Sequence, residues 1–251
     1  MWLRLRQIAL VAEKLAPVEK QLIDVLGVEV CYRDPGVGYF GLENALFPIG
    51  NQLLEVVAPI QENTAGGRYL ERRGGDGGYM VITQCDDHGP RRAQVEKLGV
   101  RLAHSFETEE FKNMQLHPKD TGITFFEIDE QQGEGAHNLD GPWEPAGPNW
   151  QRAKTNLVEG ISVAELQCND PESAANRWAE IAELPVRDNQ IALDNASLRF
   201  VACTDGRPEG LGGLDLITEN ATEIIGRAQQ AGLPVAGQQL YLCGMRINLV
   251  S

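Results

Sequence analysis

The stretches Leu53-Leu54-Glu55-Val56-Val57 and Phe125-Phe126-Glu127-Ile128 each place one glutamate among apolar residues typical of a buried strand. Each stretch ends a repeated pattern whose first strand begins near Gln7 in one copy and near Met80 in the other. The separation along the chain is nearly the same in both copies. A carboxylate is costly to place in an apolar strand unless something pairs with it. Two glutamates at equivalent points of a repeat therefore predict one shared polar site.

The pattern of strand, helix and further strands occurs four times. A short tag of the form Leu-Gly-Val or Leu-Pro-Val follows each helix, at residues 26–28, 98–100, 184–186 and 233–235. We therefore predict an α+β fold of four βαβββ modules paired into two domains. Residues 1–130 form the first domain with the site, and residues 156–251 form a degenerate second domain.

Residues 131–155 differ from the rest because they are rich in glycine and proline, which block regular helices and sheet ladders. We expect a linker or cover loop here. Its two tryptophans, Trp143 and Trp150, suggest that it packs against the protein, and one possibility is a lid over the first domain. In that case the second domain is purely structural.

The composition restricts the class of protein. Hydrophobic residues make up 42% and charged residues 23% of 251 residues, as in globular proteins with a core. The net charge of −14 argues against nucleic acid or an anionic membrane as partner. No signal peptide or membrane-spanning run is evident, and five scattered cysteines fit a reducing compartment. We therefore expect a cytoplasmic protein.

The sequence resembles the vicinal oxygen chelate superfamily, which includes glyoxalase I, methylmalonyl-CoA epimerase, bleomycin-resistance proteins and extradiol dioxygenases. The first half is most similar to the epimerase and glyoxalase type. The stretches that carry this resemblance are Leu53–Pro59, Arg68–Gly75, Gly78–Ile82 and Leu116–Gly122. The resemblance implies that two βαβββ modules curl into a cup that holds a divalent metal, with ligands from the first and last strand of each module.

Carried over to this chain, the four ligand positions fall on Gln7, Glu55, Met80 and Glu127. Met80 departs from the family pattern, which usually has histidine there, and a thioether is a poor ligand beside oxygen donors. The resemblance thus implies a site of Gln7, Glu55 and Glu127 that holds Mn²⁺, Ni²⁺, Zn²⁺, Co²⁺ or Mg²⁺ weakly, or no metal at all. Met80 and His117 are then substrate-binding residues.

Simpler interpretations of these residues remain open. Either glutamate alone fits the solvated face of a half-exposed strand, and His117 fits a structural histidine at a strand end. In the second half the equivalent positions are Val163, Arg199, Gly213 and Asn248, which form no metal cage and provide no dioxygenase iron site.

Two functions follow from these residues. The first is an isomerase or lyase acting on a small carbonyl or thioester compound, with Glu55 and Glu127 as catalytic groups that move a proton. The second is a metal-free protein that binds or sequesters a small molecule, in the manner of the resistance proteins. A small molecule is the expected partner in both, and the chain is expected to be a monomer or a homodimer.

Overall fold

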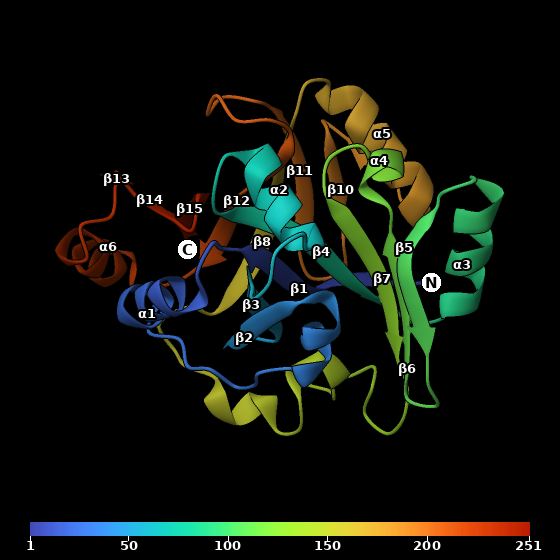
Figure 1. The fold of residues 1–251 in the computed structure, drawn as a ribbon, viewed down its shortest axis with the longest axis horizontal. Helices are drawn as coiled ribbons and strands as arrows, with labels where there is room; N and C mark the ends of the chain where they lie inside the picture. The colour runs from blue at the N-terminus through green and yellow to red at the C-terminus, as the bar shows by residue number, and fades with distance from the viewer.

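The computed structural model describes residues 1–251, which form two mixed sheets flanked by helices (Figure 1). The first module consists of β1 (Leu3–Val11), α1 (Leu15–Leu26), β2 (Leu42–Ile49) and β3 (Gln52–Pro59). The second consists of β4 (Gly77–Cys85), α3 (His88–Lys97), β5 (Leu102–Glu107), β6 (Phe111–Leu116) and β7 (Phe125–Gln131). The helices α2 (Ala65–Arg73) and α4 (Pro118–Thr121) are additions to this pair.

The second half repeats the order with shorter strands. The third module consists of β8 (Gly160–Cys168), α5 (Pro171–Ala182), β9 (Val186–Arg187), β10 (Gln190–Ala192) and β11 (Ser197–Ala202). The fourth consists of β12 (Gly210–Ile217), α6 (Ala221–Gln230), β13 (Val235–Ala236), β14 (Gln239–Leu242) and β15 (Met245–Val250). The predicted fold class, four βαβββ modules in two pairs, is confirmed.

The two sheets share one topology. The strand order is β2-β3-β1-β4-β7-β6-β5 in the first sheet and β13-β14-β15-β12-β8-β11-β10-β9 in the second. In each sheet the first strands of two modules pair antiparallel at the centre, and each has the last strand of its own module parallel on its other side. The first and last strands of both modules therefore form the four central strands of each sheet.

The first module departs from the prediction at one point. Residues 29–33 form only an isolated bridge between Tyr32 and Leu46, so this module has one strand fewer than the βαβββ pattern. A 3₁₀ helix occupies Pro35–Phe40, and β2 begins after it. The Asp34 side chain accepts a hydrogen bond from the Gly36 N–H and caps this helix, and Pro35 lacks the N–H that a longer ladder needs.

A single hydrophobic core joins both sheets. One cluster of 51 buried residues contains side chains from all four modules. At its centre Trp178 of α5 stacks on Phe126 of β7, with ring centroids 4.4 Å apart, and its indole N–H donates to the Thr121 carbonyl at 3.0 Å. None of the helices combines the length and apolarity needed to cross a bilayer.

Candidate functional site

Each module begins with a strand that carries one extra residue just before the position equivalent to a predicted ligand. The unpaired residues are Arg6 in β1, Tyr79 in β4, Ser162 in β8 and Gly212 in β12. Such bulges bend a strand and redirect side chains, and they are common beside functional sites. Their equivalent placement supports the alignment of Val163 and Gly213 with Gln7 and Met80.

Glu55 lies in a pocket of amide groups on the face of the first sheet that also carries Gln7 and Glu127, here called the first cup. One carboxylate oxygen accepts from Gln7 Nε2 at 2.9 Å and the other from Asn44 Nδ2 at 2.6 Å. The Trp143 indole N–H donates to Gln7 Oε1 at 2.9 Å. An indole N–H can only donate, so it fixes the orientation of the Gln7 amide and directs its NH₂ group at Glu55.

Burial controls the ionisation of Glu55. The side chain is only 6% exposed. Loss of solvation raises its pKa to about 7, although the hydrogen bonds from Asn44 and Gln7 act in the opposite direction and the charge of Glu127 adds to the increase. At neutral pH this group can both accept and donate a proton.

Glu127 has a different environment from Glu55. Its neighbour on the same face of β7 is Asp129. Burial raises the pKa of both carboxyl groups; contact with Glu127 raises that of Asp129 further, whereas the hydrogen bond with Asp129 opposes the increase at Glu127. Asn113 Nδ2 donates to Asp129 at 3.0 Å, and Gln115 Nε2 donates to Glu127 at 3.3 Å. The pair therefore favours a state in which at least one of the carboxyl groups keeps a proton.

The two predicted substrate-binding residues occupy different places. Met80 is buried in the wall of the first cup, where its sulfur accepts a contact from Gln115 Nε2 at 3.5 Å. His117 lies at the start of α4, outside this group, and its Nδ1 accepts from the Lys119 N–H at 3.2 Å. Thus the structure brings Gln7, Glu55, Met80 and Glu127 together and places His117 apart from them.

The residues between the two domains form part of the first cup. Trp143 and Trp150 are each 1% exposed and belong to the apolar cluster that also contains Met80 and Phe111. Bulged Arg6 holds the segment in place by donating to the carbonyls of Asn51, Leu139 and Gly141, with both indole rings against its guanidinium. The expected cover loop thus packs against the protein through its two buried tryptophans.

The arrangement does not fit a divalent ion. Both oxygens of Glu55 and the oxygen of Gln7 already accept hydrogen bonds, and the latter is directed at Trp143. The sulfur of Met80 faces an amide of Gln115. A hard cation needs oxygen donors that converge on one point, and no group of three or more His, Cys, Asp and Glu side chains does so here. The donors of the first cup satisfy each other.

In the second sheet, ion pairs fill the equivalent place. Arg199 contacts Glu165 at 2.8 Å and Asp215 at 2.7 Å, and Arg246 contacts Glu165 at 2.8 Å. Asn248 Nδ2 donates to Asp215 at 2.6 Å. In this network, which includes Arg199 and Asn248 of the equivalent positions, cationic and anionic groups neutralise one another.

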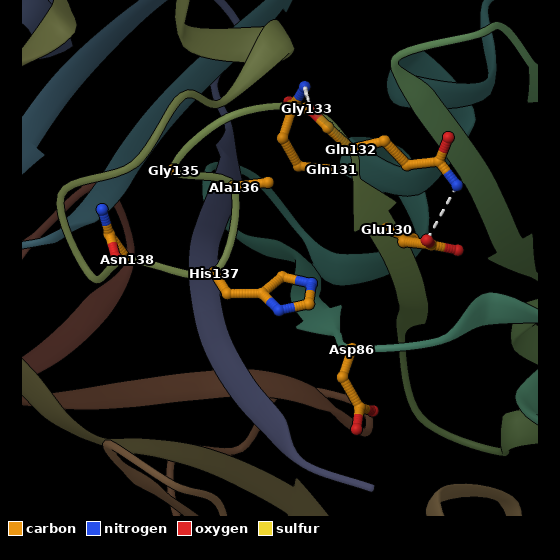
Figure 2. Close-up of a pocket in the computed structure, with 9 residues that line it drawn as sticks. All are labelled: Asp86, Glu130, Gln131, Gln132, Gly133, Gly135, Ala136, His137 and Asn138. Atoms are coloured by element: carbon orange, nitrogen blue, oxygen red, sulfur yellow. Dashed lines mark hydrogen bonds between the residues drawn. The ribbon is translucent and has the colours of Figure 1, made fainter.

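A separate polar pocket lies at the beginning of the interdomain segment (Figure 2). It has a volume of about 440 Å³, and its lining includes Asp86, Glu130, His137 and Asn138. The Gln132 amide donates to Glu130 across part of its wall at 2.9 Å. Neither Glu55 nor Glu127 lines this pocket.

Sequence reasoning missed two residues of the first cup, Asn44 and Gln115, and it gave Trp143 only as part of a possible lid. Gln115 lies on β6, directly opposite Glu127 of β7. Asn44 lies on β2, opposite Val57 of β3, and Val57 is two residues from Glu55. An amide that interrupts an apolar strand was the available signal for Asn44, which stands between Leu42 and Leu46.

Comparisons with known proteins support the fold across the whole chain. No protein-family model matches the sequence, and no curated protein matches it. A hypothetical protein from Staphylococcus aureus has a similar structure, with 12% identity, a TM-score of 0.64 and coverage of 99% of this chain and 100% of that one.

Similarity to named enzymes extends over half of the chain. Methylmalonyl-CoA epimerase from Mycobacterium tuberculosis is 21% identical, with a TM-score of 0.46 over 53% of this chain and 90% of that one. A hypothetical protein from Bacillus halodurans is 17% identical, with the same TM-score over 53% of this chain and 96% of that one. Both of these neighbours match about half of this chain.

Proposed function

We propose that the first cup catalyses proton transfer at a carbon next to a carbonyl or thioester group, as an isomerase or lyase. The observation that carries this proposal is the buried Glu55, whose pKa is raised to about 7 and which interacts electrostatically with a second buried carboxyl group, Glu127. A general base works best when its pKa is near the working pH. Two such groups suit removal of a proton and its return at a different face.

The surroundings give the two glutamates different roles. Glu55 is held by two amide N–H groups and ionises near neutral pH, so we assign it as the base that removes the proton. Glu127 and Asp129 form a buried pair of carboxyl groups whose pKa values are both raised. The pair therefore holds a proton that Glu127 can donate. In this scheme Glu127 is the acid.

An enolate intermediate also needs a hydrogen-bond donor at its oxygen. Tyr79, the bulged residue of β4, packs in the first cup together with Met80. Burial and the neighbouring Tyr69 raise the pKa of its hydroxyl, which makes no hydrogen bond to the protein. A protonated, unengaged hydroxyl is the type of donor that stabilises a developing oxyanion.

Solvent exchange tests this proposal directly. Proton NMR in D₂O measures loss of the α-proton signal from a small α-keto acid and from an acyl thioester. We expect the wild-type chain to exchange at least one of them and Glu55→Gln to be about 100-fold slower or worse, the lower range for general base catalysis. Glu127→Gln should also be slow, whereas the exposed Glu43→Gln on β2 should match the wild type. Equal rates in all four proteins would contradict the proposal.

A second candidate is binding of a small apolar molecule without chemistry. The satisfied donors and the apolar lining of the first cup, with Met80, Phe111 and Trp143, favour it. An aromatic ligand that binds equally with and without EDTA, in Glu55→Gln as in the wild type, and no exchange of any probe, would select this function instead.

A further inference from the structure

Two arginines of α2, Arg68 and Arg72, have no acidic partner. Arg68 donates only to the Asn63 carbonyl, and the guanidinium of Arg72 lies over the ring of Tyr69, 4.8 Å from its centroid. Neither forms an ion pair. Residues four apart lie on the same helix face, where two like charges repel and destabilise the helix.

These arginines form one side of a small cavity. The cavity has a volume of about 140 Å³ and is lined by Ala65, Arg68, Tyr69, Arg72, Pro118 and Phe125. Both arginines therefore border a space with apolar and aromatic walls. A volume of this size is suited to one small group and not to a whole substrate.

Aromatic contacts connect this cavity to the first cup. Tyr79 lies edge-on to Tyr69 at 5.0 Å and to Phe125 at 5.1 Å, so it contacts two of the cavity's walls. The charges of Glu55, Arg68 and Arg72 all act on the Tyr79 hydroxyl. Tyr79 thus stands between the arginines and the proposed catalytic base.

The other side of the first cup is closed. Arg6, the bulged residue equivalent to Tyr79, is covered by the interdomain segment that carries Trp143 and Trp150. In Figure 1 that segment and α2 lie on opposite sides of β2 and β3. Access from the α2 side would bring a substrate past Arg68 and Arg72 first.

We propose that Arg68 and Arg72 bind an anionic oxygen group of the substrate, a carboxylate or a phosphate, while its reacting carbon lies near Tyr79 and Glu55. Planar guanidinium groups bind both kinds of anion through paired N–H donors. The substrate class is therefore a carbonyl or thioester compound with an acidic group at its other end. The position of the reacting carbon rests on the proposed function. The anion site rests only on the cavity and on the contacts of Arg68 and Arg72.

Isothermal titration calorimetry of the full chain with pyrophosphate and with malonate tests the anion site. Loss of a hydrogen bond to a charged group weakens binding by about tenfold. We expect that loss for Arg68→Ala and for Arg72→Ala with at least one probe. Arg187→Ala removes the same charge from an exposed, unpaired position in the second domain and should leave the affinity unchanged.

Two further measurements sharpen the test. The probe that binds more tightly distinguishes a phosphate from a carboxylate site, and Arg68→Lys with Arg72→Lys should restore only part of the affinity, because lysine keeps the charge and loses the paired donors. Equal affinity in Arg68→Ala, Arg72→Ala and wild type, or no binding of either probe by the wild type, would overturn the proposal.

The anion-site proposal and the catalytic proposal can be contradicted independently of each other. Glu55→Gln should bind pyrophosphate or malonate at least as well as the wild type while losing proton exchange. If the arginine variants lose anion binding but no substrate exchanges, the anion site stands and the catalytic proposal falls.

Discussion

At the scale of single residues, the main feature is a carboxyl group whose ionisation the fold controls. Glu55 is surrounded by strands that remove water, and its two oxygens receive hydrogen bonds from Gln7 and Asn44. These bonds favour the charged form, and burial opposes it more strongly. The result is a group balanced near neutral pH inside the protein.

This balance predicts a pH dependence of stability. Because the folded-state pKa of Glu55 is raised from 4.5 to about 7, the folded chain binds this proton more tightly than the unfolded chain. The associated stabilisation is complete below about pH 4.5 and is lost as the pH rises to about 7, a change of about 3 kcal/mol. Urea unfolding between pH 4.5 and 8 should show this fall in the wild type relative to Glu55→Gln.

The control for this prediction is Glu43→Gln, which changes an exposed glutamate on the adjacent strand β2. Its curve of unfolding free energy against pH should run parallel to that of the wild type. A Glu55→Gln curve that is also parallel would show that Glu55 titrates normally.

The sequence predicts the position of these glutamates but not their partners. Glu55 and Glu127 stand out because each interrupts an apolar run, and a local pattern reveals that interruption. Trp143 lies more than one hundred residues from Gln7 in sequence, and its indole bond depends on how residues 131–155 fold back onto the first sheet. No periodicity encodes such a contact, so the orientation of the Gln7 amide could not be predicted.

At the scale of elements, all four modules share one bulge, although the two sheets carry different polar groups. The extra residues Arg6, Tyr79, Ser162 and Gly212 look like ordinary strand residues in the sequence, since one insertion hardly alters the apolar pattern. The four-module order was predictable from the recurring helices and tags. The bulges themselves depend on pairing between strands of different modules, which a single sequence does not show.

The ion pairs of the second sheet give the prediction at this scale. Arg199 holds both Glu165 and Asp215, whose side chains are only 13% and 11% exposed. We expect Arg199→Met to lower the free energy of unfolding by about 2–3 kcal/mol, because two shielded carboxylates lose a counter-charge. Urea unfolding measures this, and Arg227→Met, at an exposed pair with Glu223, should cost about 0.5 kcal/mol or less. Equal effects would show that the network adds nothing beyond surface pairs.

At the scale of the whole molecule, the two sheets do not have separate cores. The same apolar cluster contains Leu3 and Ile8 of the first sheet and Leu214 and Ile247 of the second. Hydrogen bonds also join them, since the Gln52 side-chain amide donates to the Ile161 carbonyl and accepts from the Ile161 N–H. Shared burial of this kind makes unfolding of one half costly for the other.

We therefore expect a single unfolding transition that is sensitive to Trp178. Trp178→Ala removes the stacked ring between α5 and β7 and should cost about 3–5 kcal/mol. Fluorescence of Trp143 and Trp150 reports the first sheet, and hydrogen exchange of β12 reports the second; both should shift together. Trp178→Phe, which keeps a ring, should cost less. Two separate transitions would show that the halves unfold independently.

The packing of the interdomain segment has a consequence for biosynthesis. The strands of the first sheet end at Gln131, but the indole of Trp150 that completes its inner wall is translated nineteen residues later. At ribosomal rates of about 5–20 residues per second, the nascent sheet waits about one to four seconds with that apolar face uncovered. Strand pairing on the ribosome therefore precedes the closing of this face, and during that interval a nascent chain of this protein offers a chaperone an apolar target there.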